Sequence, residues 1–102
     1  MKSNILEFEK FRIKTHRDVF TPRYDIDIYS KALRGIIKKN DKILELGTGT
    51  GAISISLAKN FNNISILATD INPYAIKIAK QNTQINKVEK IIRFKKSNWF
   101  SD

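Results

Sequence analysis

The sequence of 102 residues has no cysteine, one histidine, one tryptophan and two prolines. Without cysteine the chain can form no disulfide, thiol nucleophile or thiolate metal site, although this does not fix its compartment. No apolar run approaches the roughly 18 residues that a membrane helix needs. The first residues, MKSNILEFEKF, carry two glutamates and lack the uncharged apolar core of a signal peptide. We expect one small, cytoplasmic domain that makes no membrane contact.

Acidic residues are scarce beside basic ones: 10 Asp and Glu stand against 19 Lys and Arg, a net charge of +9. Such an excess suggests an anionic partner, for example RNA or a ribosome-bound factor. The lysines are scattered, however, and no aromatic residues are interleaved with them, as they would be in a dedicated nucleic-acid surface. A biased genome that favours lysine, isoleucine and asparagine explains the charge equally well. RNA stays a candidate partner on this ground alone.

The hydrophobic pattern alternates between strand and helix periods. The expected elements are a short strand or hairpin within residues 5–20, a helix from Asp25 to about Lys39, strands at 42–46, 63–70 and 90–97, and a helix over 71–84. Asn72 and Pro73 suit the cap and the first position of that last helix. The order predicts an α/β fold with a parallel sheet, and the apolar run at 63–70 predicts a strand buried on both faces.

Residues 52–58, AISISLA, alternate like a strand but follow a glycine loop. As a strand, this segment would lie five residues from its parallel neighbour, whereas a parallel crossover needs about a dozen residues or more. As a helix, Ile53 and Leu57 share one face, and the alanines and serines are small enough for close packing on the sheet. The connection therefore predicts a helix despite its weak local propensity.

Glycine is sparse too, and three of the four glycines lie at Gly47, Gly49 and Gly51, between a strand and this helix. A nucleoside-triphosphate loop needs Lys followed by Ser or Thr after the last glycine, but Ala52 and Ile53 follow here, which excludes that class. A dinucleotide fold spaces its glycines G-x-G-x-x-G, a different spacing. Glu45 would repel a pyrophosphate and suits a positively charged ligand without phosphate.

S-adenosylmethionine has these properties, and Asp70 ends the next strand, where an acid accepts hydrogen bonds from ribose hydroxyls. The alternative interpretation of the same residues is purely structural: a turn without a ligand, in which Asp70 caps the next helix. An NAD site also places an acid after its second strand, so Glu45 and the glycine spacing carry the distinction. His16 has no second ligand or nucleophile beside it in the sequence, and we expect a solvated loop residue and no metal site.

ILELGTGTGAISISLA, followed by ATDINPYAIKIAKQN, resembles the class I methyltransferases. VFTPRYDID and SNWFS extend the resemblance to the HemK-type protein-(glutamine-N5) methyltransferases, over roughly residues 17–101. That family modifies the glutamine of a Gly-Gly-Gln motif in peptide-chain release factors during translation termination. The resemblance implies a Rossmann-like domain, S-adenosyl-L-methionine as cofactor and a release factor as protein substrate.

The resemblance also implies roles for individual residues. The loop residues would wrap the methionine end of the cofactor, Asp70 would hold the ribose, and the adenine would lie between two residues after the third strand. These residues are Gly47, Thr48, Gly49, Thr50, Gly51, Asp70, Asn98 and Trp99, and Glu45, from the charge argument, completes the candidate cofactor site. Asn98 stands where the family usually has aspartate, and core packing is the alternative for Trp99. Arg23, in the proline-arginine segment, would face the substrate, although Tyr24 and Ile26 depart from the family pattern.

The family's catalytic Asn-Pro-Pro-Tyr run does not occur in this sequence, whose two prolines are Pro22 and Pro73. We therefore expect a short leading segment, residues 1–24, and an incomplete cofactor-binding domain, residues 25–102, with no catalytic residue of its own. A fragment of a nucleic-acid adenine-N6 or other small-domain methyltransferase and a non-catalytic remnant that binds the cofactor or a partner are alternatives. An NAD-binding half-domain is a further alternative. A truncated sheet also predicts self-association or a complementary C-terminal half as partner.

Overall fold

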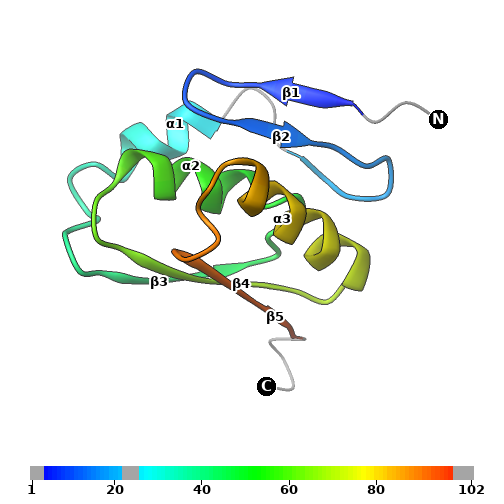
Figure 1. Cartoon of the computed structure of the whole chain (residues 1–102). Coiled ribbons are helices and arrows are strands. Elements are labelled where there is room, and N and C mark those ends of the chain that lie inside the picture. Colours follow the sequence, from blue (N-terminus) through cyan, green and yellow to red (C-terminus); the bar gives the residue numbers. More distant parts are fainter. Residues whose placement is uncertain (1–3, 22–25, 98–102) are drawn as a thin grey trace.

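The computed structural model describes residues 4–21 and 26–97, which form three layers (Figure 1). A parallel sheet forms the first layer. Two of the three helices cover one of its faces, the third helix packs against one of these two, and an antiparallel hairpin lies over the helices. The strands of the sheet are β3 (Lys42–Leu46), β4 (Ser65–Asp70) and β5 (Ile92–Lys96). The helices are α1 (Ile26–Ala32), α2 (Ala52–Asn60) and α3 (Pro73–Ile85), and the hairpin strands are β1 (Ile5–Glu7) and β2 (Arg12–Lys14). The predicted α/β fold, parallel sheet and leading hairpin are confirmed.

The sheet has the strand order β3-β4-β5, with β4 in the centre. Ile66 of β4 pairs with Ile43 of β3 and with Ile92 of β5. On the helix-covered face, Ile66 and Ile92 are buried in the core. On the opposite face, Leu44 is 60% exposed and Leu67 beside it is half-buried. The predicted burial of the central strand on both faces is therefore complete only on the helix side, where apolar side chains meet α2 and α3.

The segment that alternates like a strand is helix α2, as the connection predicted. Ser54 and Ser56 are both buried in the helix, which lets its backbone approach the neighbouring elements closely. The hydroxyl of Ser56 lies 2.7 Å from that of Ser30 in α1, a buried hydrogen bond between the two helices. Tertiary packing thus overrides the weak helix propensity of this stretch.

The predicted helix over residues 25–39 is wrong in its length, because α1 ends at Ala32. The backbone then changes to a tighter turn, in which the amides of Arg34 and Ile36 donate to carbonyls three residues earlier. Leu33 and Ile37 still pack against the core, whereas Ile36 is 68% exposed. The apolar spacing thus reports which side chains reach the core rather than a continuous helix.

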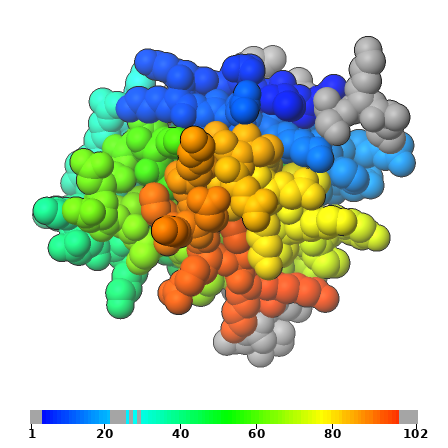
Figure 2. Space-filling view, in the orientation of Figure 1, coloured from blue at the N-terminus to red at the C-terminus, as the bar shows by residue number. Residues whose placement is uncertain are grey.

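Helix α3 begins as predicted, with Asn72 as its cap and Pro73 at its first position. The side chain of Asn72 accepts a hydrogen bond of 2.9 Å from the amide of Tyr74. The hairpin lies along the outer side of α2 and α3, and its side chains form one continuous surface with theirs (Figure 2). None of the helices in the described part of the chain is long and apolar enough to cross a membrane.

Candidate functional site

The glycine loop, residues 47–51, connects the carboxyl end of β3 to the start of α2. All three of its glycines have positive φ, +70° at Gly47, +56° at Gly49 and +85° at Gly51. A Cβ at Gly49 would lie 2.5 Å from the carbonyl oxygen of Phe20, and one at Gly51 would lie 3.2 Å from the Cβ of Ala79. A Cβ at Gly47 would meet nothing within 4 Å. Among residues 4–21 and 26–97, the loop therefore packs closely at Gly49 and Gly51, whereas Gly47 leaves space in which a ligand can approach the backbone.

Asp70 lies at the carboxyl end of β4, where the sequence placed it beside the loop. Its Oδ2 accepts a 2.9 Å hydrogen bond from the amide of Gly49, and its Oδ1 accepts one of 2.9 Å from the amide of Asn72. The carboxylate thus joins the loop to the start of α3. A carboxylate has about four acceptor positions, so two stay available to a ligand's hydroxyl groups.

Glu45, on β3, turns its carboxylate under the same loop. Its Oε1 accepts hydrogen bonds from the hydroxyls of Thr48, at 2.8 Å, and of Ser54. Burial raises the pKa of the Glu45 carboxyl above its ordinary value of 4.5, the hydrogen bonds from Ser54 and Thr48 lower it in part, and the charge of Asp70 raises it further. Glu45 and Asp70 thus bring two carboxyl groups into contact with the loop.

The two threonines of the loop turn inward. Thr48 and Thr50 are 5% and 0% exposed, and the hydroxyl of Thr50 accepts a hydrogen bond of 3.1 Å from that of Thr21. A ligand at this loop would therefore meet its backbone and glycines rather than the threonine hydroxyls. Sequence reasoning grouped all five loop residues by their position, which cannot tell inward side chains from outward ones.

The backbone amides of the loop are largely engaged within the protein. The N–H of Thr48 donates to the carbonyl of Thr69 at 2.8 Å, that of Gly49 to Asp70, and that of Gly51 to the carbonyl of Thr48 at 2.9 Å. A phosphate-binding loop instead points such groups at its ligand. Engaged amides and flanking carboxylates both disfavour a phosphate ligand and favour a neutral or cationic one with hydroxyl groups.

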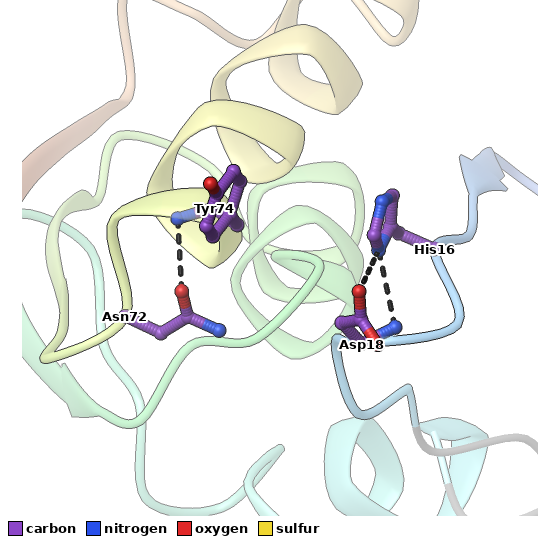
Figure 3. Close-up of polar contacts among 4 residues, drawn as sticks. All are labelled: His16, Asp18, Asn72 and Tyr74. Atoms are coloured by element: carbon purple, nitrogen blue, oxygen red, sulfur yellow. Dashed lines mark hydrogen bonds and ion pairs between the residues drawn. The ribbon is translucent and has the colours of Figure 1, made fainter.

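Two polar pairs are drawn in Figure 3, one in the loop after β2 and one between β4 and the first turn of α3. His16 turns toward Asp18, whose amide donates to its Nδ1 at 3.1 Å, and Asn72 points at the amide of Tyr74. The side chain of His16 is 40% exposed, as the prediction of a solvated residue requires. Among the described residues no group of three or more acidic or histidine side chains could hold a metal ion.

Three residues that the resemblance assigned to the site lie outside the described residues: Arg23, Asn98 and Trp99. Their roles stay predictions. The structure adds one residue that sequence reasoning missed, Asn82 of α3, which is fully buried and donates to the carbonyl of Thr50 at 2.9 Å. The only sequence signal for it was a polar side chain on the buried face of an amphipathic helix.

The strand, glycine loop and helix, with an acid at the end of the next strand, form the fold of the Rossmann-like methyltransferases. Trm5 of Methanocaldococcus jannaschii, solved in complex with adenosine, superposes with a TM-score of 0.78 and 26% identity, over 93% of this chain and 29% of that one. Residues 10–102 match the model of the methyltransferase small domain. The chain belongs to that family. The family and its structural neighbours imply a cofactor of the S-adenosylmethionine type.

Two relatives of this chain have names that specify glutamine methylation. A protein of Methanocaldococcus jannaschii named as a protein N5-glutamine methyltransferase is 41% identical over 98 residues, which cover 96% of this chain and 47% of that protein. A release factor glutamine methyltransferase of Dictyoglomus turgidum is 40% identical over 90 residues, 86% of this chain and 32% of that protein. The chain thus spans about half the length of the first of these relatives and a third of the second.

Proposed function

We propose that this chain is the cofactor-binding part of an S-adenosylmethionine-dependent methyltransferase that acts on the glutamine of the Gly-Gly-Gln motif in peptide-chain release factors. The observation that carries the proposal is the contact between Asp70 and the glycine loop, in a chain similar to named glutamine methyltransferases. A release factor acts in translation, so we place this activity in the cytoplasm.

The residues present fit this cofactor. Gly47 leaves open space beside the backbone, and the two remaining acceptor positions of Asp70 match the two hydroxyls of a ribose. The partly buried carboxylate of Glu45 lies beneath the loop, hydrogen-bonded to Thr48, and favours the positively charged methionine end. When bound, the cofactor supplies an electrophilic methyl group. The role of this chain is to hold and orient it, which lowers the barrier by positioning.

Binding of the cofactor does not by itself give methyl transfer, because the sequence lacks the Asn-Pro-Pro-Tyr run that orients the acceptor nitrogen in this family. We expect residues 1–102 to bind the cofactor but to transfer little methyl by themselves. Adding a polypeptide with the Asn-Pro-Pro-Tyr half of a relative should restore transfer to release factor.

Methyl-labelled cofactor tests the proposal. The chain, with and without that complementary half, is incubated with release factor, and separately with tRNA and rRNA. A matched release factor with the motif glutamine replaced by alanine serves as control. Label in release factor that disappears with the control supports the proposed acceptor. Label in RNA instead would support the nucleic-acid alternative, and strong transfer by the chain alone would place catalysis in residues assigned here to binding.

A further inference from the structure

We propose that Asn82 is a positioning residue, which couples the docking of the β1–β2 hairpin to the shape of the glycine loop. The inference rests on the proposed cofactor site in that loop. It concerns a residue that acts on the loop through a buried hydrogen bond to the carbonyl of Thr50.

Two asparagines, one turn apart, hold the hairpin: Asn82 within α3 and Asn86 directly after its last residue. The Oδ1 of Asn82 accepts from the amide of Lys14 at 2.7 Å, and its Nδ2 donates to the carbonyl of Lys14 at 2.9 Å. Asn86 does the same for Arg12, at 2.9 and 2.7 Å. Because Arg12 and Lys14 are alternate residues of β2, the two side-chain amides take the place of a neighbouring strand along its outer edge.

The two asparagines differ in their third hydrogen bond. The second N–H of Asn82 donates to the carbonyl of Thr50 in the glycine loop at 2.9 Å. The second N–H of Asn86 donates back to the last turn of α3, to the carbonyl of Asn82 at 2.7 Å. Asn82 thus uses both donors and its acceptor to join two segments that are far apart in the sequence, and Asn86 joins only one segment to the helix.

The chain after the hairpin contacts the same loop from the other side. The hydroxyl of Thr21 donates to that of Thr50 at 3.1 Å, and the carbonyl of Phe20 leaves no room for a side chain at Gly49. Gly51 packs against Ala79, one turn before Asn82 on α3. The loop is therefore held between α3 and residues 19–21, and the position of residues 19–21 follows the hairpin that Asn82 fixes.

The pair Asn82→Ala and Asn86→Ala tests the coupling in the 102-residue chain, because each variant loses three hydrogen bonds and only the first loses one to the loop. Titration with S-adenosylhomocysteine should give an affinity about fivefold or more weaker for Asn82→Ala than for Asn86→Ala, the effect of one net hydrogen bond. Equal affinities for the two alanine variants would overturn the inference.

Amide hydrogen exchange separates this inference from the proposed function. Asn82→Ala should speed exchange at Gly49 and Gly51 more than Asn86→Ala does, whether or not a ligand is present. If the unmodified chain binds no cofactor, the proposed function fails while exchange still decides the coupling. If Asn82→Ala does not fold, the serine variants at both positions give the same comparison. Loop amides that respond equally to both substitutions would show that Asn82 only anchors the hairpin.

Discussion

The Oδ2 of Asp70 lies 2.9 Å from the amide nitrogen of Gly49, a residue 21 positions earlier in the chain. The contact ties the carboxyl end of β4 to the middle of the glycine loop, while the other oxygen of Asp70 holds the start of α3. One carboxylate therefore shapes the loop and offers its remaining acceptor positions to a ligand.

Replacing Asp70 with alanine should weaken cofactor binding by roughly 2–4 kcal/mol, because charge-assisted hydrogen bonds to two ribose hydroxyls are lost. Calorimetric titration with S-adenosylhomocysteine measures the change. Asp41→Ala is the matched control, since Asp41 also accepts from a backbone amide, that of Lys38 at 2.8 Å, but stands before the amino end of β3. Equal affinities of Asp70→Ala and the unmodified chain would refute the assignment, and tighter binding of NADH would favour a dinucleotide site.

Glu45→Gln should change how stability depends on pH. The folded state holds the Glu45 proton more tightly than the unfolded chain, because burial raises its pKa above 4.5. From about pH 4.5 up to the raised pKa, the native state therefore binds more protons than the unfolded state. The free energy of unfolding falls as pH rises through that interval. Glutamine can keep both hydrogen bonds to Oε1 and has no proton to lose. The variant should gain stability over the unmodified chain as pH rises from about 4.5 toward neutrality.

Urea unfolding at a series of pH values checks the Glu45 prediction. Parallel stability curves for the two proteins would contradict it. The same substitution should weaken the binding of the cationic cofactor, because the carboxylate that favours its positive end is gone. A residue that lowers stability and supports binding is expected at a functional site.

Gly49→Ala should destabilise the fold more than Gly47→Ala. Both have positive φ, which costs an L-residue about 1–2 kcal/mol. Only the Cβ at Gly49 would lie 2.5 Å from a backbone carbonyl, and such overpacking adds about 1–3 kcal/mol. Gly35→Ala is the control, because Gly35 has open space around it and its φ lies outside the left-handed region. The free energies of unfolding in urea should rank Gly35→Ala, Gly47→Ala, Gly49→Ala from most to least stable, and any other order would count against this geometry.

The sequence predicted the elements that local pattern determines. The apolar runs located the strands of the parallel sheet, the period-2 stretches located the leading hairpin, and the Asn72–Pro73 pair located the start of α3. It missed the end of α1 at Ala32, because the apolar spacing of Leu33 and Ile37 is compatible with a tight turn that reaches the same core. Such an ending depends on how the turn packs against other elements.

For the candidate site, spacing identified the loop and Asp70 but not the contacts of Asn82. That side chain bonds to Lys14, 68 positions away, and to Thr50, 32 positions away. No local pattern encodes which backbone groups a buried amide will meet. The inward orientation of Thr48 and Thr50 was hidden for the same reason, since it follows from the positions of Glu45 and Thr21 in the fold.

The 102-residue chain should self-associate through β3. In the described part of the chain β3 pairs only with β4, so the backbone groups along its other edge can accept a further strand. Leu44 and Leu46 are 60% and 48% exposed on the uncovered face. The net charge of +9 opposes association, but at about 0.1 M salt charges are screened beyond about 10 Å. Sedimentation velocity over a concentration series should therefore show association that strengthens with salt.

Leu44→Lys should reduce this association, because it places charge on the apolar face beside the open edge. Ile36→Lys is the matched control, since Ile36 is 68% exposed in the turn after α1. A complementary half that pairs with β3 should compete with self-association. A single monomeric species at all concentrations, with one cooperative unfolding transition, would show that three strands close their own core. Equal effects of the two lysine variants would mean that added charge, and not the edge of β3, controls association.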